Sequence, residues 1–315
     1  MGKLAFLFPG QGSQYVGMGG ELASSYREAL DVFKKADEKL GHSLSTLCFS
    51  GPEERLILTT NTQPAVLTTS IAALAVVRHH GLPEPDFVAG HSLGEYTALV
   101  AAGVIPFEEA VTLVRQRGYF MEEAVVSGEG TMAAVLGLPE DVVLNICNQA
   151  RPYGVVEPAN YNCPGQVVIA GETTAVRKAG EIAMNEGAKR VVQLSVSGPF
   201  HSSLMGGAAG KLADELATIE FKDPSIPVIS NVNAQAVSMG QEARSMLVAQ
   251  VDHPVQWHES VEMLLANDVD TFLEIGPGRV LGGLVKKIDK KATVLNVGDL
   301  CSLEKTIAYF KEVKQ

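Results

Sequence analysis

Hydrophobic positions along the chain form short continuous runs that alternate with longer stretches of helical periodicity. The runs at 4–8, 87–89, 226–231, 271–275 and 293–297 have the length of strands buried on both faces. Between them, apolar residues recur at helical spacing over 21–40, 64–79, 96–102, 106–125, 202–219, 241–250, 254–266 and 303–313. This alternation predicts an α/β fold with a parallel sheet.

The pattern changes in the middle of the chain. There it predicts a strand at 131–137, a helix at 139–150, strands at 155–161 and 167–170, a helix at 173–187 and a strand at 190–196. The order β-α-β-β-α-β is that of the ferredoxin-like unit. We therefore predict two domains, a discontinuous one made of 1–127 and 198–315, and a small inserted subdomain at 128–197.

Composition and charge exclude several classes of protein. The 315 residues are 46% hydrophobic and 19% charged, and the net charge of 25 − 36 = −11 opposes nucleic-acid binding. No apolar run reaches membrane-spanning length, and the apolar start is too short for a signal peptide. Cys48, Cys147, Cys163 and Cys301 have no metal-like spacing, which indicates reduced thiols, no bound metal and a cytoplasmic protein.

Gly90-His91-Ser92-Leu93-Gly94 stands between a predicted strand and a predicted helix. Strand, Gly-x-Ser-x-Gly and helix are the context of the nucleophile elbow of hydrolase-like α/β folds. There Ser92 would be a nucleophile, and the N–H of Leu93 would face an oxyanion. The competing interpretation is a glycine-rich turn with an incidental serine.

A second glycine-containing loop follows the first predicted strand at residues 9–14. It lacks the Gly-Lys-Ser/Thr of a Walker A loop, and Tyr15 replaces the last glycine of a dinucleotide fingerprint. The loop at Gln11 is then either an ordinary turn or the source of a second oxyanion donor.

The helix predicted at 106–125 carries Arg117 on its apolar stripe, between Val114 and Met121. A buried arginine needs an anion, because an unpaired buried charge costs several kcal/mol. The anion is either a buried Asp or Glu of the chain or a substrate carboxylate, which the guanidinium fork matches.

His201 follows Gly198-Pro199-Phe200, where the chain returns from the inserted subdomain. It is the best-placed base for Ser92, because the other histidines flank helix ends or, like His91, should point away from the cleft. Asn160 and Asn162 lie at the predicted hairpin of the insertion. They either cap that turn or, with Met121, line a shared pocket.

Five segments in order closely resemble the malonyl-CoA:acyl-carrier-protein transacylases of type II fatty-acid synthesis. They are residues 8–14, 90–95, 116–118, 198–201 and 274–278. The resemblance implies that Ser92 is the nucleophile, His201 its base and Arg117 the carboxylate ligand. It implies backbone oxyanion donors at Gln11 and Leu93, a group on Gln250 that orients His201, and selection against methylmalonyl by the bulk of Phe200.

The resemblance also implies the reaction and its partners. A malonyl-serine intermediate would pass malonyl from malonyl-CoA to the phosphopantetheine thiol of an acyl carrier protein, without metal or redox cofactor. Carrier proteins of this kind are acidic, so Lys189, Arg190, Lys286 and Lys287 are either docking residues or solvated surface. We expect a monomer, and the alternatives are a serine hydrolase and a non-enzymatic binding module.

Overall fold

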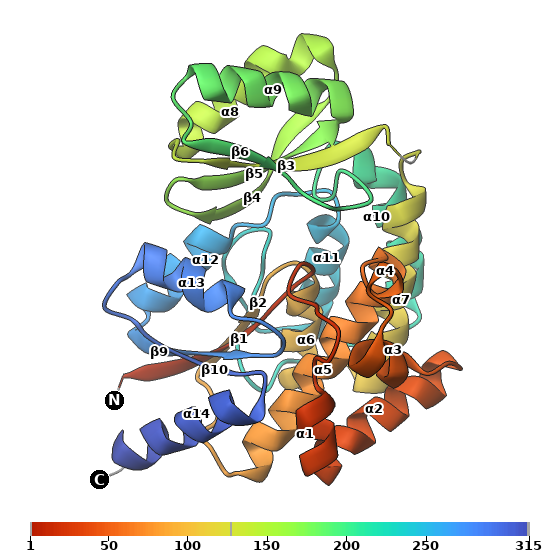
Figure 1. The fold of residues 1–315 in the computed structure, drawn as a ribbon, viewed down its shortest axis with the longest axis vertical. Helices are drawn as coiled ribbons and strands as arrows, with labels where there is room; N and C mark the ends of the chain where they lie inside the picture. The colour runs from red at the N-terminus through yellow and green to blue at the C-terminus, as the bar shows by residue number, and fades with distance from the viewer. Residues whose placement is uncertain (1, 127, 314–315) are drawn as a thin grey trace.

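The computed structural model describes residues 2–126 and 128–313, and its strands form two sheets (Figure 1). Ser127, where we predicted a domain boundary, lies outside the described residues. The strands are β1 (Lys3–Phe8), β2 (Phe87–Gly90), β3 (Gly130–Leu136), β4 (Val156–Cys163), β5 (Gln166–Glu172), β6 (Arg190–Gln193), β7 (Val228–Ile229), β8 (Ala236–Val237), β9 (Val269–Ile275) and β10 (Thr293–Val297).

Helices cover both faces of the large sheet and the outer face of the small sheet (Figure 1). The α-helices are α1 (Gly20–Ser25), α2 (Arg27–Leu40), α3 (Leu44–Ser50), α4 (Glu53–Leu56), α5 (Thr59–His79), α6 (Leu93–Ala101), α7 (Phe107–Glu123), α8 (Glu140–Ala150), α9 (Thr173–Asn185), α10 (Gly206–Ala217), α11 (Gly240–Gln250), α12 (Trp257–Ala266), α13 (Val280–Ile288) and α14 (Leu300–Val313). Short 3-10 turns occupy Arg151–Tyr153 and Ser203–Met205.

The large sheet has six strands in the order β10-β9-β1-β2-β7-β8. Every pair is parallel except β7 and β8, which are antiparallel. The predicted parallel sheet is therefore a mixed one. Only six residues connect β7 to β8, and a connection that short joins antiparallel strands but cannot cross over to a parallel one.

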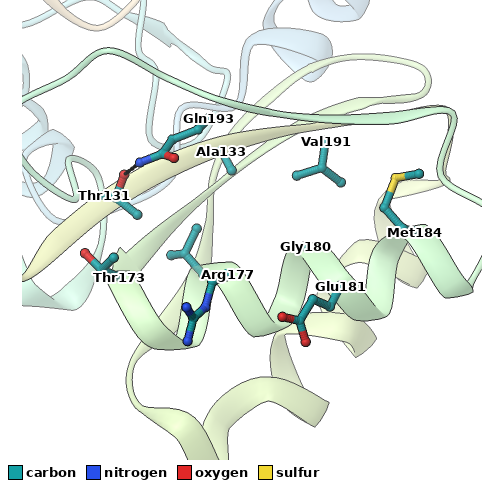
Figure 2. A pocket seen from close by; sticks show the side chains of 10 residues that line it. Thr131, Ala133, Thr173, Arg177, Gly180, Glu181, Met184, Val191 and Gln193 are labelled. Atoms are coloured by element: carbon teal, nitrogen blue, oxygen red, sulfur yellow. Dashed lines mark hydrogen bonds between the residues drawn. The ribbon is translucent and has the colours of Figure 1, made fainter.

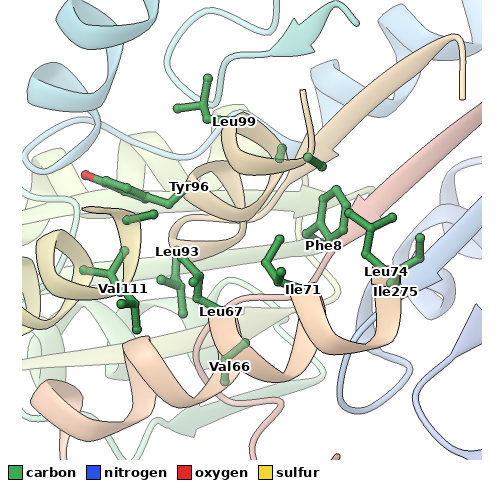
Figure 3. Close-up of a cluster of buried hydrophobic side chains, with 14 of the residues drawn as sticks. Phe8, Val66, Leu67, Ile71, Leu74, Leu93, Tyr96, Leu99, Val111 and Ile275 are labelled. Carbon is green, nitrogen blue, oxygen red and sulfur yellow. The ribbon is translucent and has the colours of Figure 1, made fainter. Parts of the chain in front are cut away.

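Side chains of β1 alternate between two apolar clusters on opposite faces of the large sheet. Leu4, Phe6 and Phe8 belong to the cluster that contains α5, α6 and α7, whereas Ala5 and Leu7 pack with α12 and α13. Figure 3 shows Phe8 of β1 and Ile275 of β9 near Ile71 and Leu74 of α5. Burial on both faces is the reason that this strand is an unbroken apolar run.

The small sheet has four antiparallel strands in the order β4-β5-β3-β6. Ala133 and Val135 of β3 pack with α8 and α9, whereas Met132 and Ala134 join the cluster that includes the large sheet. The strand period of two thus gives this sheet one face covered by its own helices and one turned toward the rest of the molecule. Figure 1 shows α8 and α9 on its outer side.

Several predicted boundaries differ from the structure. The helix predicted at 21–40 is broken at Tyr26, whose backbone is extended and whose ring packs edge-on against His79 and His80. The helix predicted from Pro64 begins at Thr59 and includes the proline. In both cases contacts remote in sequence overrode local propensity, at Thr59 through its backbone N–H, which donates to Glu122 Oε1 at 2.7 Å.

Candidate active site

Ser92 lies in a sharp turn between β2 and α6. Its φ of 52° and ψ of −108° fall outside the regions that L-residues prefer. A Cβ on Gly90 would come within 1.9 Å of the Gly94 backbone, and a Cβ on Gly94 within 2.0 Å of the Phe8 carbonyl oxygen. Only glycine fits these two positions. Gly90 and Gly94 therefore allow strand β2 and helix α6 to approach closely, which exposes Ser92 at the start of the helix.

His201 meets Ser92 from a position 109 residues further along the chain. The Ser92 Oγ and His201 Nε2 are 2.7 Å apart, and His201 Nδ1 lies 2.7 Å from the backbone oxygen of Gln250. Because a carbonyl only accepts, Nδ1 carries the ring hydrogen in the neutral imidazole. Nε2 is then free to accept the Ser92 hydroxyl proton.

The imidazole of His201 is neutral at ordinary pH. Burial, together with the positive charge of Arg117, lowers the pKa of His201 to about 3. A neutral ring with a free Nε2 is the form that acts as a base. The hydrogen bond from Ser202 Oγ to Pro199 O, at 2.6 Å, stabilises the turn that carries the ring.

Gln250 orients His201 through its backbone, not its side chain. The side-chain Oε1 instead accepts from Arg117 Nη2 at 3.0 Å, and Nε2 donates to the Ser92 carbonyl oxygen at 2.9 Å. Any residue at position 250 would offer the same carbonyl to His201. The amide side chain therefore has a separate task.

Arg117 is only 1% exposed and reaches the same hydroxyl. Its Nη2 lies 3.2 Å from Ser92 Oγ, and its Nη1 donates to Gln63 Oε1 at 2.8 Å. All its hydrogen bonds within the described residues go to neutral oxygens, and its buried Nε has no partner. Of the two interpretations open from the sequence, this geometry favours a ligand carboxylate over a direct internal ion pair.

Gln11 and Leu93 flank Ser92 with free backbone donors. Both residues line the cavity beside Ser92 and His201. Within the described part of the chain, neither backbone N–H has an intramolecular acceptor. The Gln11 side chain donates a hydrogen bond from Nε2 to Thr59 Oγ1 at 3.2 Å, which fixes its position. Two unpaired N–H groups beside a serine form a site for an oxyanion.

The cavity at Ser92 has a volume of about 90 Å³, and Met121, Phe200 and Asn160 contribute to its walls. A neighbouring cavity of about 190 Å³ shares Gln11 and Asn160 with it and adds Asn162. Both asparagines are buried, so the structure favours the shared pocket over the exposed turn as their location. The two cavities lie between the small sheet and the carboxyl ends of β1 and β2.

His91 does not turn away from the cleft as the sequence suggested. It lines both cavities, and its Nε2 lies 2.9 Å from Asn162 Oδ1. Its ring is also tilted against Trp257 at a centroid distance of 5.5 Å. Burial lowers the pKa of His91.

The basic residues predicted to dock a partner are exposed and lie outside the Ser92 cavity. Lys286 and Lys287 lie in the last turn of α13, and Lys287 Nζ donates to Gln166 Oε1 at 2.9 Å. Gln166 lines the larger neighbouring cavity, which places Lys287 at its rim. Lys189 and Arg190 lie at the start of β6.

Sequence reasoning missed four residues of this site, Thr59, Gln63, Glu95 and Asn231. Gln63 accepts a hydrogen bond from Arg117, and Glu95 accepts one from Gln250. Asn231 Oδ1 accepts from the Ser92 backbone N–H at 2.6 Å. Each is a buried polar residue. Burial of a polar side chain is the signal, and the sequence alone does not reveal it.

A further cavity of about 330 Å³ lies between α9 and strands β3 and β6 (Figure 2). It shares none of its lining residues with the Ser92 cavity. Across the described ranges, no cluster of three or more His, Cys, Asp or Glu side chains is arranged to hold a metal ion. No described helix combines the length and apolarity needed to cross a bilayer.

Comparison with known proteins gives a consistent result. The acyl transferase domain family matches residues 5–299. The malonyl CoA-acyl carrier protein transacylase of Bacillus subtilis is 49% identical over 313 residues, which is 99% of this chain and 98% of the relative. The crystal structure of the Clostridium perfringens malonyl CoA-acyl carrier protein transacylase superposes with a TM-score of 0.96 at 46% identity, covering 99% of this chain and 98% of that one.

One solved structure in the same range shows a type II PKS acyl carrier protein in complex with its malonyl-transacylase. It has a TM-score of 0.95 and 44% identity, and it covers 98% of this chain and 99% of that chain.

Proposed function

The chain belongs to the acyl transferase domain family and, within it, to the malonyl CoA-acyl carrier protein transacylases, and we propose that it loads malonyl from malonyl-CoA onto the phosphopantetheine thiol of an acyl carrier protein. The observation that carries the proposal is the convergence on one hydroxyl. Ser92 Oγ lies 2.7 Å from a neutral imidazole and 3.2 Å from a buried guanidinium.

Acylation begins when His201 Nε2 takes the Ser92 proton and Oγ attacks the thioester carbonyl carbon. The backbone N–H groups of Gln11 and Leu93 hold the tetrahedral oxyanion, and one such donor is worth about 3 kcal/mol. The C–S bond breaks, and the CoA sulfur takes the proton from His201. The product is malonyl-Ser92.

Transfer is the same chemistry in reverse order. The phosphopantetheine thiol gives its proton to His201 and attacks the malonyl-Ser92 ester. Ser92 Oγ leaves and recovers the proton. A neutral backbone carbonyl is a sufficient hydrogen-bond partner for His201 Nδ1, and no carboxylate is needed there. A thiol is a good leaving group, so it requires little protonation by the imidazolium.

Arg117 supplies selectivity for malonyl. A guanidinium has five N–H donors, and three are engaged by Gln63, Ser92 and Gln250. The remaining two, one of them the orphaned Nε–H, are left for a substrate carboxylate. Phe200 is buried against the same cavity, and its ring leaves little room for a 2-methyl group, a discrimination of about 1–3 kcal/mol.

The finer description of the fold belongs to this proposal. We assign the large sheet to a hydrolase-like core with a nucleophile elbow at Ser92, supported by its strained φ and the two glycines that have no room for a Cβ. We assign 128–197 to a ferredoxin-like subdomain, supported by the strand order β4-β5-β3-β6. Residues 1–127 and 198–315 form the catalytic domain.

The carrier protein is proposed to approach along α13. Lys286 and Lys287 lie on that helix, beside the cavity that adjoins the Ser92 pocket, and Lys189 and Arg190 offer a second basic pair. Acidic carrier proteins would be steered to these residues although the whole chain carries a net charge of −11. The related complex with a type II PKS carrier protein supports this class of partner.

Mixing the protein with malonyl-CoA and weighing it by mass spectrometry tests the function. One malonyl group should appear on Ser92, remain there without acceptor, and move to added holo carrier protein. Ser92→Ala should stay unlabelled. Rapid release of free malonate without acceptor would instead indicate a hydrolase, and absence of any label would indicate a binding module.

A further inference from the structure

Glu95 is a buried carboxylate that the proposed chemistry does not use. It lies in the first turn of α6, three residues after Ser92, and is only 2% exposed. Within the described residues it forms no salt bridge by direct contact. A buried carboxylate is costly to keep unless it is well hydrogen-bonded, so its contacts are informative.

One oxygen of Glu95 accepts two hydrogen bonds. Gln250 Nε2 donates to Oε2 at 2.6 Å, and the backbone N–H of Asn231 donates to the same oxygen at 3.1 Å. The other carboxylate oxygen has no hydrogen bond in the described part of the chain. All the anchoring therefore passes through Oε2.

The Gln250 amide can adopt only one orientation. Its Nε2 lies within hydrogen-bonding distance of three acceptors, namely Glu95 Oε2, the Ser92 carbonyl oxygen at 2.9 Å and Asn231 Oδ1 at 3.4 Å. Its Oε1 faces the donor Arg117 Nη2 at 3.0 Å. A flipped amide would set its oxygen against three oxygens and its NH₂ against the guanidinium.

Asn231 extends the same anchoring to the turn that carries Ser92. Its Oδ1 accepts from Ser92 N at 2.6 Å, and its Nδ2 donates to Gly90 O at 2.7 Å. Glu95 thus fixes the backbone of Asn231 and the side chain of Gln250, which flank Ser92. Arg117, in turn, takes its position from Gln250 and Gln63.

We propose that Glu95 is a positioning residue, whose Oε2 locks the Gln250 amide so that Gln250 Oε1 holds Arg117 in place for the malonyl carboxylate. The inference rests on the proposed function, since it concerns how selectivity for malonyl arises there. Glu95 acts through Gln250 and does not touch the acyl group. The hydrogen-bond acceptor matters, and the negative charge does not.

Two substitutions at position 95 separate the acceptor from the charge. Glu95→Gln removes the charge and keeps an oxygen that can occupy the Oε2 position, with its NH₂ in the unused Oε1 position. Glu95→Leu removes the acceptor at similar volume. The measurement is the rate of acyl-enzyme formation from malonyl-CoA divided by that from acetyl-CoA.

Glu95→Leu should lower the malonyl-to-acetyl ratio about tenfold, the effect of losing one well-made buried hydrogen bond, and Glu95→Gln should restore it. Equal loss with both thioesters would reduce Glu95 to a structural residue and overturn the proposal. A Glu95→Gln enzyme as unselective as Glu95→Leu would also overturn it, because charge would then be the cause.

Gln250→Met tests the same relay if Glu95→Leu fails to fold. It keeps the carbonyl that contacts His201 and removes the amide that contacts Arg117, so the ratio should again fall about tenfold. An unchanged ratio would overturn the relay. Failure of the proposed function is a different result, since wild-type protein would then take no malonyl label on Ser92.

Discussion

His201 and Glu95 are both buried, and burial moves their pKa values in opposite directions. The pKa of His201 falls to about 3 and that of Glu95 rises to about 7, in each case chiefly by desolvation. His201 stays unprotonated in the fold while the unfolded chain protonates near 6.5, so its contribution to stability is lost as pH falls below 6.5. Glu95 keeps its proton longer in the fold, so its contribution is present below about 4.5 and lost as pH rises toward 7.

Acylation should not follow the titration of an ordinary histidine. With a pKa of about 3, His201 remains a base at pH 5.5. The rate of malonyl-Ser92 formation should change less than about twofold between pH 7.5 and 5.5, whereas a base of pKa about 6.5 would lose about tenfold. Stopped-flow or quenched-flow acylation across this range measures it. A fall in the acylation rate centred near pH 6.5 would mean that His201 is more solvated than the structure indicates.

Replacing Arg117 should remove the preference for malonyl. Arg117→Met keeps most of the buried volume but loses the guanidinium, and a charge-assisted hydrogen bond is worth about 1.5–3 kcal/mol. The malonyl-to-acetyl ratio of acylation should fall about ten- to hundredfold. Arg115→Met is the matched control, because Arg115 lies on the same helix but bonds Leu40 O and His42 instead. If Arg117→Met kept its preference for malonyl, the malonyl carboxylate would not bind at Arg117.

Residue chemistry singled out Ser92, Arg117 and His201, which the structure brings together, because a flanked serine, an arginine on an apolar stripe and a histidine after a chain break are each unusual. The supporting residues gave no such signal. Gln63 lies 54 residues from Arg117, and Glu95 lies 155 from Gln250. Their importance comes from partners that only the folded chain brings near. The backbone role of Gln250 is invisible in principle, since every residue has a carbonyl.

The strand, turn and helix around Ser92 are set by close packing of backbone on backbone. Gly94 lies against the end of β1, and Gly90 lies against Gly94 itself. Element types and order were predictable here because the apolar runs are continuous and are followed by glycine-containing turns. Element ends were not, as at Tyr26 and Thr59, because aromatic packing and side-chain hydrogen bonds from distant segments decide them.

Gly94→Ala should destabilise the protein strongly. The added Cβ would lie 2.0 Å from the carbonyl oxygen of Phe8, in a central strand that has no room to move. We expect a loss of about 3 kcal/mol in the free energy of unfolding, measured by urea denaturation. Gly210→Ala is the control, because this glycine lies within α10 and a Cβ there meets no atom within 4 Å. It should stabilise by up to about 1 kcal/mol, and equal effects of the two changes would contradict the packing argument.

The site lies where the two sheets of the molecule meet. The small sheet is held there by the β4 edge, where Val255 N donates to Ala159 O at 2.9 Å and Tyr161 N donates to Val255 O at 2.9 Å. The succession of strands along the chain was readable from the pattern of apolar runs, except for β8, which no run predicted. The placement of one sheet over the other was not, since it depends on such pairings across about a hundred residues of chain.

Charge reversal on α13 should separate the two half-reactions. Lys286→Glu together with Lys287→Glu should raise the KM for carrier protein about tenfold at low salt and weaken its salt dependence, because steering by surface charge is screened by ions. Formation of malonyl-Ser92 should fall much less. Lys34→Glu with Lys35→Glu on α2 is the control pair, because neither residue lines the Ser92 cavity or the cavity beside it. If the rates of acylation and of transfer to carrier protein fell equally, the carrier protein would not dock on α13.

The central position of β1 has a consequence for synthesis. This strand is made before its neighbour β9, which lies some 260 residues later along the chain. The four strands of the small sheet, by contrast, are contiguous and complete by residue 193. A nascent chain can therefore finish the later-encoded small sheet first, while β1 waits, paired on one side only, until β9 has also been made.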